Sequence, residues 1–272
     1  MILFCLLSLA KSGSQVKNKP LKTGGVKELQ AVANMIASAR SVAVLTGAGV
    51  SKESGIPTFR DAQTGLWAKY DPQQLATTAG FKSDPGLVWR WYDYRRQLLA
   101  SVEPNNGHYA LVELEGLVPK VTVVTQNVDG LHQKAGSHNV IELHGSITSF
   151  FCFDKRHPAA DVAAGLSEPP RCHCGSLIRP AVVWFGEMLP EEAFDRASEA
   201  MFEADVILVI GTSGLVQPAA SLPLTARLRG AKIVEINPER TPIAESADAF
   251  LEGPSGQILP QLVEALKACG KR

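Results

Sequence analysis

The sequence has no hydrophobic run long enough to cross a membrane, and it has no excess of either charge. No stretch approaches the roughly 18 apolar residues that a membrane-spanning helix needs. The 27 basic and 27 acidic side chains give a formal net charge of zero. Bulk attraction to nucleic acid or to a membrane surface is therefore not expected. Any protein partner must be recognised by local contacts.

Cysteine is also scarce, at five of 272 residues. An odd and unevenly spaced set does not suit a disulfide framework. Three of the five, Cys152, Cys172 and Cys174, lie close together in the sequence. This grouping favours a metal-binding module and a reducing or mitochondrial compartment.

Acidic residues are missing from the N-terminal segment before Glu28. Residues 1–10 are apolar, and lysines follow them, whereas a secretory signal carries its positive charge before the apolar region. Scarcity of acid favours a mitochondrial presequence, although such segments prefer arginine and this one has none. A disordered tail or a misplaced start codon is the alternative. We predict a tail or targeting segment over 1–27 and a mitochondrial location, or otherwise a cytoplasmic or nuclear one.

Apolar, β-branched runs alternate with helical patterns along most of the chain, which predicts an α/β fold. The expected strands are 41–46, 120–125, 139–143, 205–210 and 232–236, and the expected helices are 28–39, 218–228 and 256–268. This order predicts a Rossmann-like parallel sheet with helices on both faces. Ligands of such sheets bind beyond the carboxyl ends of the strands.

Two segments interrupt the alternation. Residues 84–102 form an aromatic-rich helical pattern, and residues 149–180 contain Cys, His, Pro and Gly with little periodicity. We predict one domain over 28–272, in which these helical and cysteine-containing insertions build a small lobe. The expected small lobe comprises 68–107 and 148–184, and the large lobe comprises 28–67, 108–147 and 185–272.

The first expected strand leads into the Gly-x-Gly turn of residues 47–49, which can bring backbone N–H groups close to a pyrophosphate. Alone, this turn is weak evidence, because many Gly-x-Gly sequences are ordinary tight turns. The usual fingerprint opens a helix with a third glycine, but Ser54-Gly55-Ile56-Pro57 stops a helix and places Phe59 and Arg60 on a loop. The whole segment 47–60 resembles the nucleotide-binding segment of the sirtuins, the NAD-dependent protein lysine deacylases.

A polar cluster, Gln126 to His132, follows the expected strand 120–125. Taken alone, it could be a turn whose Asn and Asp bind local backbone groups. It resembles the second sirtuin motif, in which Asn and Asp contact nicotinamide and its ribose. The resemblance assigns these roles to Asn127 and Asp129.

His144 follows the short expected strand 139–143. A lone histidine is more often structural, but the ordinary pKa of this side chain suits proton transfer near neutral pH. The matching sirtuin histidine is the general base. In that reaction the acyl-lysine carbonyl oxygen attacks the nicotinamide ribose, nicotinamide leaves, and the histidine deprotonates a ribose hydroxyl. The products are free lysine and an acyl-ADP-ribose.

Carried over residue by residue, the resemblance implies a site for NAD as a consumed co-substrate. Ser255 is a departure, because class III sirtuins usually carry a cysteine there, near the adenine. His144 and Asn127 are the implied catalytic residues. The implied NAD-binding residues are Gly47, Ala48, Gly49, Glu53, Thr58, Phe59, Arg60, Gln126, Asn127, Val128, Asp129, Gly211, Thr212, Ser213, Asn237, Pro238, Glu239 and Ser255.

Substrate residues are implied in two places. The segment Val183-Trp184-Phe185-Gly186-Glu187 matches the sirtuin strand that pairs with an extended acyl-lysine peptide, although alone it could be a core-packing edge strand. Tyr92 and Arg95 project from one helix face, where they could hold a carboxylate or merely pack with arginine in solvent. Class III sirtuins carry Tyr-x-x-Arg here and remove succinyl, malonyl and glutaryl groups. Ala76 would leave room for such a chain.

Zinc is the point at which the pattern departs from the family. Sirtuins hold a structural zinc with two Cys-x-x-Cys pairs. Here Lys155 stands where the second cysteine should follow Cys152, and the second pair is compressed to Cys172-His173-Cys174. The degenerate ligand set would be Cys152, Cys172 and Cys174, with His157 or His173 as the fourth.

The sequence therefore predicts an NAD-dependent protein-lysine deacylase that removes succinyl, malonyl and glutaryl groups and is a weak deacetylase. Its expected partners are acylated-lysine proteins. The alternatives are a protein mono-ADP-ribosyltransferase, a deacetylase without acidic-acyl preference, and an NAD sensor without catalysis. A hydride-transferring dehydrogenase fits worst, because the third-glycine helix is missing.

Overall fold

The computed structural model describes residues 23–57, 75–159, 162–163 and 165–270. The NAD-binding residues Thr58, Phe59 and Arg60 lie outside this described part. So does the expected targeting segment up to residue 22.

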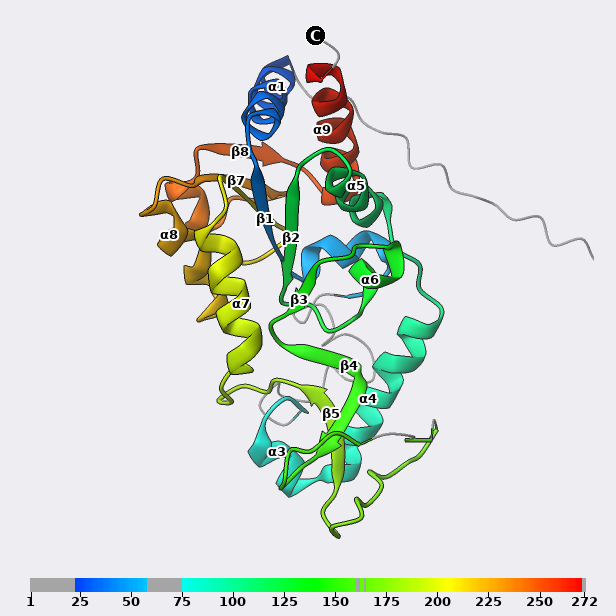
Figure 1. Ribbon diagram of the computed structural model, residues 1–272. Helices are drawn as coiled ribbons and strands as arrows, with labels where there is room; N and C mark the ends of the chain where they lie inside the picture. The colour runs from blue at the N-terminus through cyan, green and yellow to red at the C-terminus, as the bar shows by residue number, and fades with distance from the viewer. Residues whose placement is uncertain (1–22, 58–74, 160–161, 164, 271–272) are drawn as a thin grey trace, which may run out of the picture.

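A six-stranded, wholly parallel sheet forms the centre of the large lobe, in the order β3-β2-β1-β6-β7-β8 (Figure 1). Each strand is a short run of β-branched and apolar residues, as expected for strands buried on both faces. Five strands match the predicted ones within two residues, whereas β8 was not predicted, because four residues give too short a pattern. The strands are β1 (Ser41–Thr46), β2 (Lys120–Thr125), β3 (Val140–Glu142), β6 (Val206–Ile210), β7 (Lys232–Asn237) and β8 (Ala249–Glu252).

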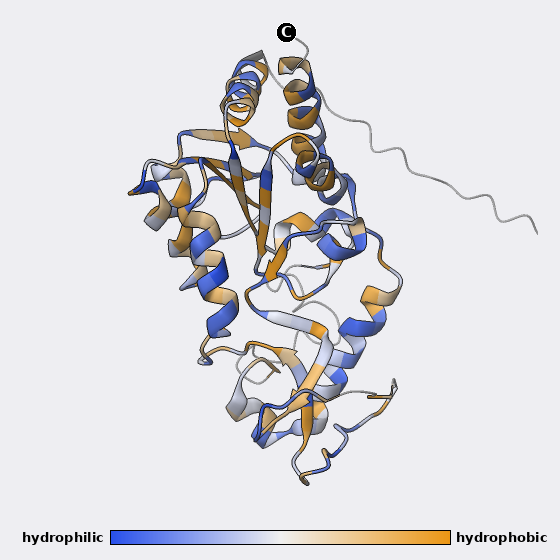
Figure 2. Cartoon of the chain, viewed as in Figure 1, coloured by the Kyte–Doolittle hydropathy of each residue, from blue (hydrophilic) through white to orange (hydrophobic). Residues whose placement is uncertain are grey.

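Helices cover both faces of this sheet, which confirms the predicted layers (Figure 1). Alternate residues of β1 point to opposite faces, so Val42 and Val44 pack in one core and Ala43 and Leu45 in the other. The strands are the apolar centre of the molecule in Figure 2. The first face is covered by α1 (Thr23–Ala37), α5 (Asn106–Glu115) and α9 (Ser255–Cys269), and the second by α7 (Glu191–Phe202) and α8 (Leu222–Arg227).

Two helices differ from their predicted bounds. The helix expected from Glu28 begins at Thr23, within the expected tail. The helix expected over 218–228 is divided into a 3₁₀ turn, η4 (Ala219–Ser221), and α8. Pro223 explains this division, because proline favours the first turn of a helix and disfavours its interior.

The small lobe combines the two predicted insertions. Helices α3 (Thr78–Ser83) and α4 (Pro85–Ala100) pack against an antiparallel pair, β4 (Gly145–Cys152) and β5 (Ile178–Val182). Its core is aromatic, with Phe81, Trp91, Tyr92 and Trp184 all buried in one cluster. Strand β4 extends into residues 149–180, for which the sequence predicted little regular structure. The prediction missed this part of the strand because the residues show no clean alternation of apolar and polar side chains.

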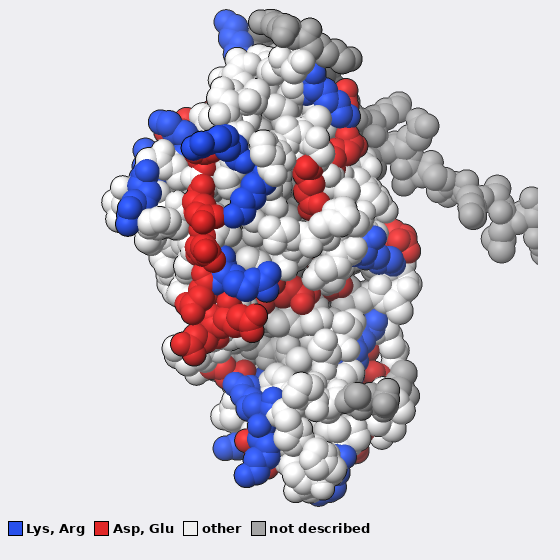
Figure 3. All heavy atoms as spheres, in the orientation of Figure 1, with Lys and Arg blue, Asp and Glu red and all other residues white. Residues whose placement is uncertain are grey.

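Three short elements complete the described chain: η1 (Ala48–Ser54), α6 (Leu131–Ala135) and η5 (Pro242–Ser246). Among the described residues, no helix is both long and apolar enough to cross a membrane. On the face drawn in Figure 3, acidic side chains gather along α7, whose exposed acids include Glu191, Glu192, Asp195 and Glu199.

Candidate functional site

One cavity of about 1060 Å³ lies at the carboxyl ends of the strands, between the sheet and the small lobe. All of the predicted catalytic, NAD-binding and substrate-binding residues in the described part of the chain line it. The sequence missed several other lining residues, among them Ser51, Trp91, Leu98 and Leu99. Helical spacing on α4 could have indicated Leu98 and Leu99, which lie one turn beyond Tyr92 and Arg95.

Two glycine turns pack directly against each other on the nucleotide side. Gly49 donates its N–H to the carbonyl of Gly211 at 2.8 Å. A Cβ on Gly47 would lie 2.8 Å from that carbonyl oxygen, and a Cβ on Gly211 would lie 2.5 Å from the nitrogen of Val50. Gly211 also has a φ of 59°, which favours glycine. These positions therefore need glycine for the close approach of two backbones.

The chain after the first turn forms a 3₁₀ helix, η1, which ends at Gly55 with a φ of 89°. This confirms that the helix of a usual dinucleotide fingerprint is stopped early. Ser51, within η1, donates its hydroxyl to Asp129 at 2.7 Å and accepts from the Asn127 amide at 3.2 Å. Ser51 thus joins the two predicted motifs. Its place inside the first motif is the only signal that could have identified it.

The side chains of Asp129 and Asn127 are held in place by burial and by hydrogen bonds to neighbouring residues. Burial raises the pKa of the Asp129 carboxyl, and hydrogen bonds from Leu131 and Ser51 oppose this effect. Asn127 is 7% exposed, and its backbone N–H donates to Thr125 Oγ1 at 3.0 Å. The two polar side chains are therefore fixed at the cavity wall before any ligand binds.

His144 is oriented as a base. Its Nδ1 lies 2.9 Å from the carbonyl oxygen of Gln126, which can only accept a hydrogen bond. Nδ1 therefore carries the proton, and Nε2 has the lone pair. Burial lowers the pKa of His144 below its ordinary value, and the Gln126 contact opposes the shift. The imidazole is thus neutral at pH 7 and can accept a proton.

The adenosine-side loops meet at the start of α9. Asn237 donates to the Thr212 carbonyl at 2.9 Å, and Glu53 accepts from the Gly256 N–H at 2.6 Å. Ser255 is 3% exposed, and its hydroxyl has no hydrogen-bond partner among the described residues. A buried hydroxyl without a partner fits a ligand that supplies one, as a nucleotide does. The residues present therefore fit NAD.

The predicted peptide-binding segment is held by backbone hydrogen bonds rather than within a regular strand. Val183 donates to the His144 carbonyl, and Phe185 donates to the Ala76 carbonyl, both at 2.9 Å. An isolated parallel bridge joins Thr77 to Phe185. These bonds place residues 76–77 and 183–185 beside His144.

Tyr92 and Arg95 converge on the same wall of the cavity. Tyr92 is 3% exposed, and its hydroxyl accepts the Trp184 indole N–H at 2.9 Å, so its own proton remains available for donation. The Arg95 guanidinium lies 4.8 Å from the Trp91 ring and 5.7 Å from the Tyr92 ring. Within the described part of the chain, no carboxylate forms an ion pair with it. Its neighbour Arg96, in contrast, pairs with Asp93 at 3.1 Å.

Arg95 stays charged and the Tyr92 phenol stays protonated, as binding a carboxylate would require. Burial lowers the pKa of Arg95, whereas Tyr92 and Asp129 raise it. Burial raises the pKa of the Tyr92 phenol. At neutral pH the site thus offers a cation and an O–H donor.

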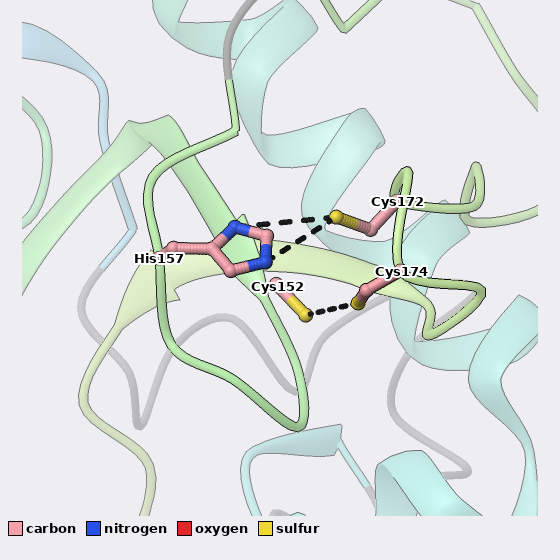
Figure 4. Close-up of side chains that lie close together, drawn as sticks. All are labelled: Cys152, His157, Cys172 and Cys174. Atoms are coloured by element: carbon pink, nitrogen blue, oxygen red, sulfur yellow. Dashed lines mark hydrogen bonds between the residues drawn. The ribbon is translucent and has the colours of Figure 1, made fainter.

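Three cysteines and one histidine converge in the small lobe (Figure 4). The ligand atoms of Cys152, His157, Cys172 and Cys174 all lie within 4.8 Å of one another. The sulfur atoms of Cys152 and Cys174 are 3.4 Å apart, and Cys172 Sγ lies 3.7 Å from His157 Nε2. Tetrahedral zinc needs ligand separations of roughly 3.3–3.8 Å.

The donor set therefore fits a structural zinc of the Cys₃His type. Of the two histidines that the sequence left open, His157 has a ligand atom within 4.8 Å of all three cysteine sulfurs. His173 Nδ1 lies 3.5 Å from Cys172 Sγ, but His173 is not part of this group of four. When bound, such a zinc would hold the end of β4 against the loop that carries Cys172 and Cys174. Sequence spacing could not choose between the histidines, because both lie in irregular chain.

Comparisons with known proteins agree with this site. Residues 47–218 match the Sir2 family. NAD-dependent protein deacylase 2 of Pyrobaculum aerophilum is 50% identical over 245 residues, which cover 87% of this chain and 95% of the relative. NAD-dependent protein deacylase of Mycobacterium tuberculosis is 49% identical over 233 residues, covering 84% and 98%. A solved Sir2 homologue in complex with NAD superposes with a TM-score of 0.84 at 46% identity, over 88% of this chain and 94% of that one. The chain therefore belongs to the Sir2 family, the sirtuins.

Proposed function

We propose that this sirtuin is an NAD-dependent protein-lysine deacylase that prefers acyl groups ending in a carboxylate, namely succinyl, malonyl and glutaryl groups. The observation that carries the preference is Arg95, a half-buried cation on the cavity wall that forms no ion pair with a carboxylate of the described residues, although Asp129 acts on it from a longer distance. The proposal places the acyl carboxylate between Arg95 and the Tyr92 hydroxyl.

Family membership supports the general activity. Relatives that are 47–50% identical over most of this chain are NAD-dependent protein deacylases. A Sir2 protein bound to a myristoylated histone peptide is 32% identical and has a TM-score of 0.72. We infer that the substrates of this chain are likewise acylated proteins, bound as extended peptides along residues 183–187.

His144 would act as the base of this reaction. Its Nε2 takes the proton of a ribose hydroxyl of NAD, while Asn127, Ser51 and Asp129 hold the nicotinamide ribose. The acyl carbonyl oxygen bonds to C1′ of the ribose as the bond from C1′ to nicotinamide breaks, and the deprotonated hydroxyl then attacks the acyl carbon. Addition of one water molecule breaks the bond between the acyl carbon and the lysine nitrogen, which frees the lysine amine and leaves the acyl group on the ribose. The products are nicotinamide, the deacylated peptide and 2′-O-acyl-ADP-ribose.

Charge complementarity supports the acidic-acyl preference. Arginine offers a planar fork that matches a carboxylate, and such pairs are stronger in a site that excludes water. An uncharged acyl chain would leave the half-buried Arg95 without a directly paired carboxylate among the described residues, which is less favourable. Ala76 also lines the cavity, and its small side chain suits a longer acyl chain.

Four peptides of one sequence, carrying acetyl-, butyryl-, succinyl- or glutaryl-lysine, test the proposal. Butyryl is the matched control, because it has the chain length of succinyl without the carboxylate. We expect kcat/KM for succinyl to exceed that for butyryl at least tenfold, which corresponds to about 1.4 kcal/mol. Equal values for the two peptides would contradict the acidic-acyl preference.

Mass spectrometry of the products separates deacylation from ADP-ribosyl transfer. Deacylation predicts 2′-O-acyl-ADP-ribose and an unmodified lysine. ADP-ribose attached to the peptide would instead identify a mono-ADP-ribosyltransferase.

A further inference from the structure

The carboxylate of Glu187 accepts hydrogen bonds from several residues of the small lobe and is therefore not an open substrate contact. Its two oxygens accept from the Arg179 guanidinium at 2.7 and 3.0 Å. One of them also accepts the backbone N–H of Trp184 at 2.8 Å. Burial opposes the charge, but the Arg179 and Trp184 hydrogen bonds outweigh it and keep the pKa of Glu187 below its usual value. Glu187 is therefore ionised.

Glu187 also joins two adjacent walls of the predicted peptide site, residues 76–78 and residues 183–185, which pair directly through the hydrogen bond from Phe185 to the Ala76 carbonyl. Thr78, at the start of α3, donates its hydroxyl to the carboxylate at 3.2 Å. Trp184, on the other wall, donates its backbone N–H to the same group. The Glu187 carboxylate thus adds a side-chain link between residues 76–78 and residues 183–185, beside their backbone pairing.

Arg179 connects this junction to the cysteine cluster. It is 1% exposed and lies on β5, where it pairs with Phe151, next to the pair of Ile178 with Cys152. Its guanidinium donates to the Val182 carbonyl at 2.7 Å and stacks on the Trp184 ring. A shift of β5 against the metal ligands would therefore move Arg179, and with it Glu187 and Trp184.

Trp184 carries the connection to the acyl side of the cavity. It is 1% exposed, and its indole N–H donates to the Tyr92 hydroxyl at 2.9 Å. Because the hydroxyl oxygen accepts this bond, its own proton points away from the indole N–H. The direction of the Tyr92 O–H is thus set by Trp184.

We propose that the Arg179–Glu187 ion pair positions the acyl-lysine site, fixing Trp184 directly and the Tyr92 hydroxyl through Trp184, and that it links the cysteine-containing module to acyl selectivity. Arg179 does not line the cavity, and Glu187 is assigned no contact with the reacting atoms. A buried ion pair contributes little net stability compared with apolar packing, but the loss of one partner leaves the other charge uncompensated. Its role here is to hold two walls at one separation.

Glu187→Gln tests the positioning of the peptide. The variant keeps the shape of the side chain but removes the charge. We expect KM for an acetyl-lysine peptide to rise at least tenfold, with KM for NAD within twofold of the wild-type value and the metal content unchanged. An equal rise of both KM values, or an unchanged peptide KM, would overturn the proposal. Glu199→Gln, on the exposed acidic row of α7, is the matched control and should change neither constant.

Trp184→Phe tests the step to Tyr92 and remains informative if Glu187→Gln does not fold. It removes the indole N–H while keeping an aromatic ring. We expect the succinyl-to-butyryl ratio of kcat/KM to fall at least fivefold, with unchanged metal content. An unchanged ratio would contradict this step.

The Tyr92 step rests on the proposed acidic-acyl preference, whereas the Glu187→Gln test on an acetyl peptide does not. A wild-type enzyme without succinyl preference would therefore refute the proposed function and this step together. The positioning role of the ion pair would still be decided by the peptide KM.

Discussion

The two halves of the cavity are built in different ways. The nucleotide half consists of backbone turns at the ends of β1, β6 and β7, where Gly47, Gly49 and Gly211 allow two chains to touch. The acyl half consists of side chains from distant segments, such as Tyr92 and Trp184. Nucleotide binding can thus be set by local turns, whereas selectivity for the acyl group depends on side chains that pack together across long sequence distances.

The largest effect is expected at His144, where the two halves meet. His144→Tyr removes the base that serves both substrates, and loss of a general base typically costs about 10²–10⁴ in rate. Turnover of acyl peptide should fall by that factor, while NAD binding measured by calorimetry should stay within a few-fold. Wild-type turnover in this variant would show that another group is the base.

Gly211→Ala should weaken NAD binding in the nucleotide half without affecting the acyl half. The new Cβ would lie 2.5 Å from the Val50 nitrogen, at a φ of 59°. We expect KM for NAD to rise at least tenfold while the peptide KM stays the same. Gly230→Ala is the control, since Gly230 has a φ of 95° but nothing within 4 Å of its Cβ position. An equal effect of both substitutions would assign the loss to backbone strain instead of turn packing.

Removal of the metal should weaken peptide binding in the acyl half of the cavity. Cys172→Ser removes one of the four converging ligands, so the protein should lose its zinc, and the peptide KM should rise several-fold with little change in KM for NAD. Elemental analysis and steady-state kinetics on one preparation measure both. Cys269→Ser changes a half-buried cysteine of α9 outside the cluster and should leave metal and kinetics unaltered. Full zinc content in Cys172→Ser would contradict the assigned ligand set.

The pH dependence should be the smallest effect near neutrality. A base works in its neutral form, and the pKa of His144 lies below the ordinary 6.5, so kcat should keep more than half of its plateau value down to pH 6.5 and should fall further at lower pH. The fold needs monitoring by circular dichroism over the same range, because burial lowers the pKa of His132 to about 3 and its protonation favours unfolding as the pH falls. A half-loss of kcat above pH 6.5, with the fold intact, would be inconsistent with this environment of His144.

The nucleotide half could be predicted from the sequence because its determinants are local. A strand, a glycine turn and the polar residues after it stand together in the chain, and parallel strands bring their carboxyl ends to one edge. Long-range contacts were the part that could not be predicted. Three features depend on how separate segments pack: the place of Ser51 between two motifs, the choice of His157 over His173, and the contacts of Glu187 with Arg179.

The most direct test of the acidic-acyl site compares wild type with Arg95→Met, using succinyl- and butyryl-lysine peptides of the same sequence. We expect kcat/KM for succinyl to fall about 100-fold and the value for butyryl to change less than threefold. Arg96→Met, which removes an arginine paired with Asp93, should preserve the ratio. Equal losses for the two peptides in Arg95→Met would contradict the claim that Arg95 binds the acyl carboxylate.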